Sequence, residues 1–349
     1  MATSTSVAAW SSTTAAPLLS PCNLNLGQGS LTIQGDTTAT LNGGQLNASG
    51  GLIISENANA DISNSLNLGG GDIELSSSGI IELSGSQINV DDISVTGSSR
   101  VTFDSQINAS SFTQTGSGTT TFSGTGNNYF DSVSLEGGTV IANQDGIAFH
   151  TNDLSLANVE LQLGADYQIP TWASVTLEEN VTLFLNGTTQ AWNELTINGN
   201  STIDFGNGNG TLSIGSLDID PSAVLTILNW SSEDLAVFNA QVDPNAATPQ
   251  IVFAGAGGGT WDPYTGNISP IGVVPEPTTY GFLLMSTIFF GWQWRARRRS
   301  PAHWSSSHVP QRRSSSFFGR YTHPPRHPRP TSVKPPLLTS LAPALVVLR

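Results

Sequence analysis

Short triplets with an apolar, a polar and a second apolar residue recur along most of the chain, separated by turns rich in Gly, Asn, Ser and Asp. Those that begin between positions 66 and 107 read LNL, IEL, IEL, INV, ISV, VTF and INA, and they start 5 to 8 residues apart. In an extended triplet the two outer side chains share one face and the middle side chain points to the other. The pattern therefore predicts many short strands, each with one apolar and one polar face.

Strands of this length are too short for an ordinary sandwich, whose strands usually run to about five or six residues. Three short strands and three corners instead make one coil of about 20 residues, with the outer triplet residues in a shared core. We predict an all-β fold, a right-handed parallel β-helix (β-solenoid) of about ten coils over residues 24–228, with Gly and Asn at corners of positive φ. An antiparallel up-and-down β fold is the alternative.

Two stretches depart from the regular pattern. Residues 112–130 are poorer in large apolar residues and are interpreted either as weaker coils or as a loop. In residues 229–272 the triplets thin out and large aromatic residues replace them: Trp230, Phe238, Phe253, Trp261 and Tyr264. Because the last coil of a solenoid exposes its core, this segment is predicted to be an irregular capping segment.

Charge is divided sharply between the two ends of the chain. Residues 1–274 hold 25 acidic residues against the single basic residue Arg100, a formal charge of −24, whereas residues 275–349 carry +10. An acidic body of this size repels phosphate backbones, so no nucleic-acid binding is expected. Charged residues make up only 11% of the chain and Gly contributes 36 residues, a composition typical of a turn-rich β protein.

The N-terminal segment, residues 1–23, shows no clear signal peptide. It has no Lys or Arg and lacks the apolar stretch of about 7 to 15 residues that a secretory signal needs. Cys22 is the only cysteine, so no intrachain disulfide is possible, and Pro21 before it argues against a lipoprotein cleavage site. We expect a signal upstream of Met1.

A different segment has the character of a membrane span. Residues 278–294, TTYGFLLMSTIFFGWQW, are apolar on all faces, which argues against a buried amphipathic helix, and lie at the lower edge of the roughly 17 to 25 residues needed to cross a bilayer. A cluster of basic residues follows the span: Arg295, Arg297, Arg298 and Arg299. By the positive-inside rule this cluster stays in the cytoplasm, and the acidic body lies outside.

Two prolines before the span add a feature that a plain anchor does not need. Pro275 and Pro277 flank Glu276 and favour an extended chain, because proline fixes its own φ and disfavours helix in the preceding residue. The sequence therefore predicts an exposed Pro-Glu-Pro tripeptide beside the membrane, which a processing enzyme can recognise.

The C-terminal part of the chain resembles a known class. The runs LTINGNSTIDFGNGNGTLSIGSLDIDPSAVLTILNW, IVFAGAGGGTWDPYTGNISPI and VPEPTTYG look like bacterial PEP-CTERM proteins whose ectodomains resemble autotransporter-associated β-strand repeats. The resemblance covers Leu195 to Arg299; residues 24–194 share only composition and rhythm.

The resemblance implies that residues 273–299 form a sorting signal read by an exosortase, a membrane transpeptidase. Pro275, Glu276 and Pro277 would then be recognition residues, and the arginine cluster would set topology. One departure is that the chain continues through residues 300–349, a basic, Pro-rich segment without Asp or Glu. We interpret it as a disordered cytoplasmic tail or as sequence translated beyond the normal stop, as after a frameshift.

Candidate catalytic chemistry is sparse. A polysaccharide lyase needs positive charge to stabilise its intermediate, and Arg100 is the only candidate in the body. His150 is the only histidine among the first 300 residues, which rules out a histidine metal cluster there. Adjacent acids at 91–92 and 178–179 point alternate ways along a strand. We therefore predict no enzyme, with no catalytic, metal or cofactor-binding residue.

The sequence thus favours a secreted bacterial surface or matrix protein, structural or adhesive, held by one span until an exosortase processes it, with exopolysaccharide as the expected neighbour. The alternative is a glycoside hydrolase on a β-helix, which needs two carboxylates about 5 to 10 Å apart. A glycan-binding module would show exposed aromatic residues at coil spacing; the small number of aromatic residues in the body argues against such a row.

Overall fold

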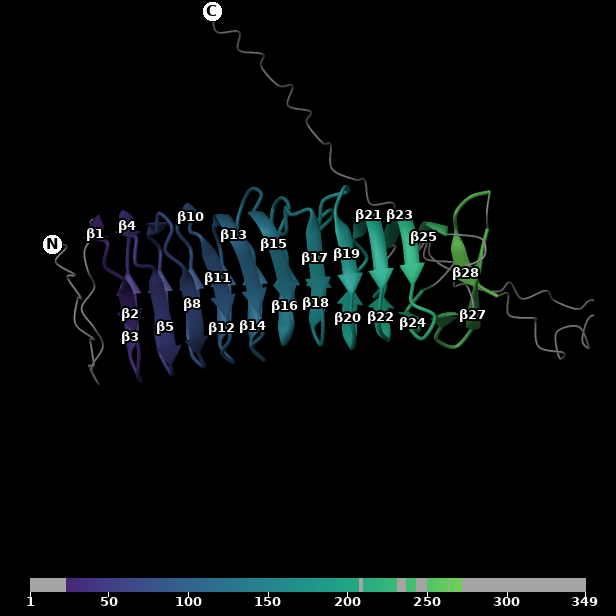
Figure 1. Ribbon diagram of the computed structural model, residues 1–349, viewed down its shortest axis with the longest axis horizontal. Helices are drawn as coiled ribbons and strands as arrows, with labels where there is room; N and C mark the ends of the chain where they lie inside the picture. The colour runs from purple at the N-terminus through teal and green to yellow at the C-terminus, as the bar shows by residue number, and fades with distance from the viewer. Residues whose placement is uncertain (1–22, 207–209, 231–236, 243–249, 263, 272–349) are drawn as a thin grey trace, which may run out of the picture. The chain divides into compact units, whose positions relative to one another are not determined.

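The computed structural model describes residues 23–206, 210–230, 237–242, 250–262 and 264–271, which all belong to one compact unit, Met1–Phe282. Within these residues the chain forms no α-helix and winds into a parallel β-solenoid of about ten turns (Figure 1). The predicted all-β solenoid is confirmed. The antiparallel alternative is wrong, because every pairing from β1 (Leu24–Gly27) to β26 (Ile251–Phe253) is parallel.

Each early coil contributes one strand to each of three faces. The first face consists of β1, β4 (Gln45–Ala48), β7 (Ser65–Asn67) and β10 (Gln87–Asn89). The second face consists of β2 (Leu31–Ile33), β5 (Leu52–Glu56), β8 (Ile73–Ser77) and β11 (Asp92–Val95). The third face runs the whole length as β3 (Thr38–Leu41), β6 (Asn59–Ile62), β9 (Ile80–Leu83), β12 (Arg100–Phe103), β14 (Thr119–Phe122), β16 (Thr139–Ala142), β18 (Glu160–Leu163), β20 (Val181–Phe184), β22 (Ser201–Asp204), β24 (Leu225–Leu228) and β26.

The first two faces merge in the later coils. Strand β13 (Gln106–Gln114) pairs with both β10 and β11, so one long strand replaces two short ones. The strands that follow are β15 (Tyr129–Leu135), β17 (Asp153–Leu156), β19 (Ser174–Leu177), β21 (Thr189–Ile197), β23 (Thr211–Ile219) and β25 (Val237–Val242). The predicted plan of three strands per coil therefore holds only for the N-terminal coils.

The coil length explains the regular core. On the second face Leu31, Leu52, Ile73, Ile93 and Phe112 are register partners in successive coils, 19 to 21 residues apart. The predicted coil of about 20 residues is therefore confirmed. Because side chains alternate along a strand, these positions all point inward and stack on one another.

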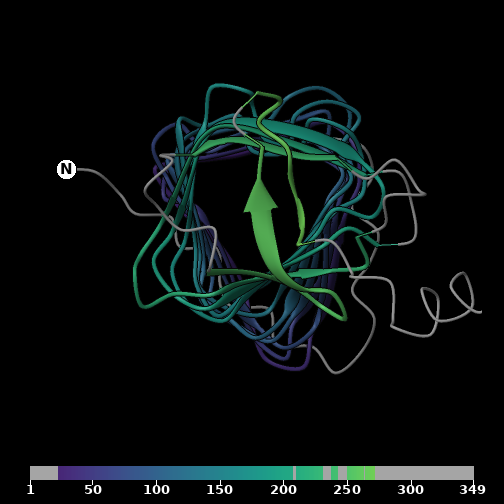
Figure 2. The same cartoon turned by 90° about the vertical axis from the view of Figure 1, so that its right-hand side faces the viewer.

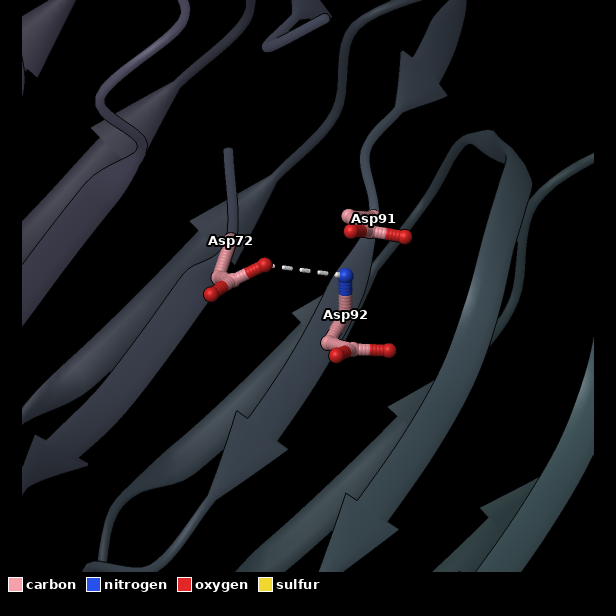
Figure 3. A group of neighbouring side chains, drawn as sticks. All are labelled: Asp72, Asp91 and Asp92. Carbon is pink, nitrogen blue, oxygen red and sulfur yellow. Dashed lines mark hydrogen bonds between the residues drawn. The ribbon is translucent and has the colours of Figure 1, made fainter. Parts of the chain in front are cut away.

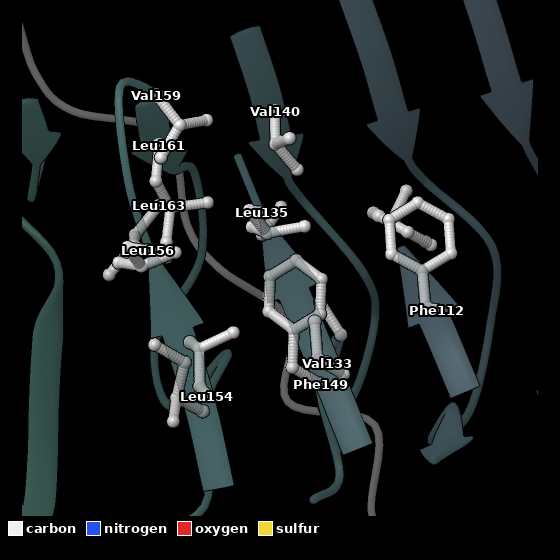
Figure 4. Close-up of a cluster of buried hydrophobic side chains, with 14 of the residues drawn as sticks. Phe112, Val133, Leu135, Val140, Phe149, Leu154, Leu156, Val159, Leu161 and Leu163 are labelled. Atoms are coloured by element: carbon white, nitrogen blue, oxygen red, sulfur yellow. The ribbon is translucent and has the colours of Figure 1, made fainter. Parts of the chain in front are cut away.

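The aromatic part of the core lies in the stretch that was ambiguous from sequence. Residues 112–130 form coils, and they place Phe112 and Phe122 in the interior with ring centroids 5.2 Å apart. Phe149 packs edge-on against Phe122 at 5.2 Å, and leucines and valines of neighbouring coils continue the cluster (Figure 4). The loop interpretation of this stretch is wrong.

The predicted corners of positive φ are confirmed. Asn158 and Asn180 have φ of 50° and 52° and occupy one corner of successive coils, where Asn180 Nδ2 donates to Asn158 Oδ1 over 3.0 Å. Gly138 has φ of 68°, and a Cβ there would lie 2.3 Å from the carbonyl oxygen of Gly118. These corners require a residue that tolerates left-handed backbone.

The C-terminal end of the described solenoid changes direction. Strands β27 (Gly257–Trp261) and β28 (Ile268–Pro270) pair antiparallel, and β27 pairs antiparallel with β26. Figure 2 shows this part of the chain crossing the end of the coil. Trp230 packs edge-on against Phe253 there, with centroids 5.3 Å apart.

Buried side-chain amides stabilise the coils in which the first face has no strand. Gln144, Gln168 and Gln190 are each at most 1% exposed. Gln168 Oε1 accepts from the backbone N–H of Gln144 at 2.8 Å, and Gln190 Oε1 accepts from that of Gln168 at 3.1 Å. Gln168 Nε2 donates to the carbonyls of Gln144 and Gly146 at 3.1 and 2.7 Å. These amides thus satisfy backbone groups that a strand ladder would otherwise satisfy.

We expect the substitution Gln168→Met to lower the free energy of unfolding by about 2 to 3 kcal/mol, because it leaves buried backbone groups without partners at similar side-chain volume. The thermal midpoint should fall by roughly 5 to 10 °C. Gln162→Met is the matched control, since Gln162 lies half-buried on the outside of β18. Equal midpoints for the two variants in calorimetry would show that the amide ladder does not stabilise the fold.

Candidate functional site

The predicted sorting residues lie outside the described residues. This applies to Pro275, Glu276 and Pro277, to the span 278–294 and to the arginine cluster 295–299. Among the residues that the structure describes, no helix has the length and apolarity needed to cross a membrane. The sorting signal therefore stays a prediction from sequence.

A column of asparagines follows the outer surface of the first face. Asn25, Asn47, Asn67, Asn89 and Asn108 are register partners from one coil to the next. The side chains at Asn47 to Asn108 reach one another in part, since Asn67 Nδ2 donates to Asn47 Oδ1 at 3.4 Å and Asn108 Nδ2 donates to Asn89 Oδ1 at 2.9 Å. Each is at least partly accessible to solvent.

Aromatic side chains continue this column. Asn108 pairs with Tyr129, which forms a parallel bridge with His150. The ring centroids of Tyr129 and His150 are 4.5 Å apart, and the indole of Trp172 lies edge-on to His150 at 5.1 Å. Tyr129 and Trp172 are 41% and 50% exposed. The expectation that the chain has no exposed aromatic row at coil spacing is therefore wrong.

A groove of about 620 Å³ runs beside the two parts of this column. Its walls combine amides and rings with backbone of the corner between the first and second faces, and they include Asn67, Asn89, Asn108, Tyr129 and His150. Across the groove lie Ser110, Asp131 and Asn152. Polar groups with a few aromatic surfaces in a concave site are typical of ligand-binding sites.

Three carboxylates meet next to the groove. Ligand oxygens of Asp72, Asp91 and Asp92 all lie within 4.8 Å of one another, and all three residues are exposed (Figure 3). Asp72 Oδ1 accepts from the backbone N–H of Asp92 at 3.2 Å, and Ser110, which lines the groove, donates to Asp91 Oδ1 at 2.7 Å. Such a group of hard oxygen ligands has the chemistry to hold a divalent cation such as Ca²⁺.

The sequence analysis named no metal ligand and treated the Asp91–Asp92 pair by itself. The coil explains what it missed: Asp72 precedes β8 and Asp92 occupies the same place in the next coil, where Ile73 pairs with Ile93. The spacing of 20 residues between Asp72 and Asp92 equals one coil, so this spacing was the available signal.

The other residues weighed for chemistry are not brought together. Arg100 lies on the outside of the third face, with Ile80 and Thr119 as its register partners. His150 lines the groove instead. Glu178 accepts a hydrogen bond from Asn198 Nδ2 at 3.0 Å on the outer surface of the later coils.

Two exposed aspartates have lowered pKa values. The hydroxyl and the backbone N–H of Ser222 both donate to Asp220 Oδ1, at 2.6 and 2.8 Å, and hold the pKa of that carboxyl below its usual value. The pKa of Asp262 is lowered by the backbone N–H of Tyr264 and the hydroxyl of Thr265. Hydrogen bonds to the charged form have this effect, and both aspartates fix a turn.

We expect Asp91→Asn to raise the thermal midpoint by about 1 to 2 °C at low ionic strength, because it removes charge from three adjacent carboxylates and keeps an acceptor for Ser110. The gain should shrink in 1 M salt, where screening weakens the repulsion. Asp36→Asn, at an exposed acid outside the cluster, is the control. A gain that is independent of salt would contradict the electrostatic explanation.

A lowered pKa makes the stabilisation from Asp220 dependent on pH. The contribution is present above the pKa of an unfolded aspartate, about 3.9, and is lost as pH falls through the lower folded value. Wild type should therefore exceed Asp220→Asn in thermal midpoint at pH 6, and the two midpoints should converge at about pH 2. A difference that stays constant over this range would show that the charge of Asp220 has no part in it.

Comparison with models of protein families, with curated proteins and with solved structures gives no match to this chain. Its function is therefore argued from the groove, the columns and the sequence signals.

Proposed function

We propose that the chain is a structural or adhesive protein of the bacterial cell surface or extracellular matrix, and that its neighbour there is exopolysaccharide. The observation that supports this proposal is the repetition of polar groups on the outside of the solenoid. On the second face one column holds Ser94, Thr113, Ser134, Ser155 and Thr176 in register. A surface that repeats with every coil suits a polymer that repeats as well, rather than a single small substrate.

The route to the surface is the second part of the proposal. The body of −24 and the basic end of +10 agree with a chain whose body lies outside and whose arginine cluster stays inside. Pro275, Glu276 and Pro277 would be recognised by an exosortase-type transpeptidase, and the span 278–294 would anchor the chain only until that step. We also infer a right-handed solenoid, since crossover connections between parallel strands are almost always right-handed.

The enzymatic alternative has a concrete candidate in Asp72, Asp91 and Asp92. Two carboxyl groups at such short separation are compatible with a retaining glycosidase. A general acid, however, needs an apolar setting that keeps it protonated, and these three residues are exposed. We therefore favour the structural role; release of reducing sugar from a polysaccharide by the wild type, abolished by Asp92→Asn, would instead support the enzyme.

Mass spectrometry of the mature C-terminus tests the proposed sorting. In a host with a matching exosortase, surface-exposed protein should lack peptides from residues 278–349. Replacing Glu276 by Ala should leave the chain uncleaved in the membrane fraction, because recognition of the tripeptide is lost. Glu136→Ala, in the described body, should be processed like wild type. Surface-exposed protein that still carries Glu276 to Arg349 would refute the sorting.

A further inference from the structure

We propose that the groove beside the asparagine and aromatic column is a binding site for a neutral polysaccharide. Tyr129, His150 and Trp172 would form its stacking platform, and Asn67, Asn89 and Asn108 its row of hydrogen-bonding groups. The proposal rests on the proposed function only for the kind of neighbour, since the site itself is argued from its geometry.

The rings have the chemistry to bind a sugar face. A pyranose presents C–H groups on its faces and hydroxyls around its rim, and an aromatic ring packs well against the former. Trp172 is 50% exposed and Tyr129 41%, although side chains of this size are usually more buried. They flank His150, which lies 4.5 Å from the tyrosine ring and 5.1 Å from the indole. The three rings thus form one short platform over successive coils.

The asparagines supply the groups that a sugar rim needs. Each amide offers two N–H donors and a carbonyl acceptor. Asn108 Nδ2 uses one hydrogen for Asn89 Oδ1, so its second hydrogen can reach a ligand. Because hydroxyls both donate and accept, a row of amides pairs with them without a charged partner.

The length of the column favours a polymer over a single sugar. From Asn25 to His150 the column passes through seven successive register positions, as given by the pairings of β1, β4, β7, β10, β13 and β15 and by the bridge from Tyr129. Neighbouring strands lie about 4.8 Å apart, so the column spans about 30 Å. A monosaccharide would contact only a small part of it.

The charges around the groove exclude an anionic polymer. Asp131 lines the groove, and Asp91 lies next to it through its bond to Ser110. Arg100 is the only basic residue among residues 1–274, and it lies on the third face. A uronate would therefore meet repulsion without a cation to pair with.

Affinity electrophoresis of the purified full chain tests the proposal. The gels contain hydroxyethylcellulose, xylan, galactomannan or dextran as neutral probes and polygalacturonate as the anionic probe. At least one neutral polymer should retard wild type, and polygalacturonate should not. Trp172→Ala and Tyr129→Ala should each raise the dissociation constant about 10-fold or more, because an aromatic anchor is lost.

Two controls separate stacking from general effects. Tyr129→Phe keeps the ring and should bind within about 3-fold of wild type. Tyr264→Ala removes a 96% exposed tyrosine that lies outside the groove and should bind as wild type does. In wild type, the bound polymer should also slow oxidation of Trp172 by N-bromosuccinimide, read by peptide mass spectrometry, which needs no variant to fold.

Several results would overturn the proposal: no retardation by any neutral polymer, unchanged binding by Trp172→Ala, or retardation by polygalacturonate equal to that by the neutral probes. None of them affects the sorting, which is read from the mature C-terminus. Conversely, an unprocessed C-terminus together with ring-dependent sugar binding would refute the sorting and leave this site intact.

Discussion

Parallel hydrogen bonding between successive coils is the constraint on which the rest of the structure depends. Each coil must return the chain to the same place, because its strands pair with the coil before and the coil after. Close packing at corners enforces this: a Cβ on Gly116 would lie 2.0 Å from the carbonyl oxygen of Gly97 in the preceding coil. The positions on each face are therefore held in register, and the apolar positions of the triplets stack into one continuous core.

The same constraint turns sequence spacing into surface chemistry. Residues one coil apart become neighbours, as Asp72 and Asp92 do at 20 residues and Tyr129 and His150 do at 21. A site on such a fold is therefore a column rather than a pocket made by loops. A substitution changes one position of a column, whereas an insertion within a coil would shift the register of everything after it.

Much of the fold followed from the sequence because the signal was local and repeated. Each triplet, such as LSL at 154, carries its own strand period, and turn residues mark the corners. The merging of the first two faces in β13 could not be predicted, since it depends on which neighbours a strand finds. Gln168 gave no signal either, because a buried glutamine is recognised only by the backbone groups it satisfies. Trp172 and His150 form a row only when the chain is written out at coil length.

Rigidity and repetition together explain how weak contacts could serve an adhesive role. A hydrogen bond from one amide such as Asn108 contributes little in water, and one exposed ring contributes more but still modestly. The backbone ladder holds these groups in place before any ligand arrives, so binding costs little ordering of the protein. A polymer that engages several positions at once gains further, because each later contact is intramolecular. Loss of Trp172 alone would then weaken adhesion without ending it, since the asparagine column and the remaining rings keep their positions.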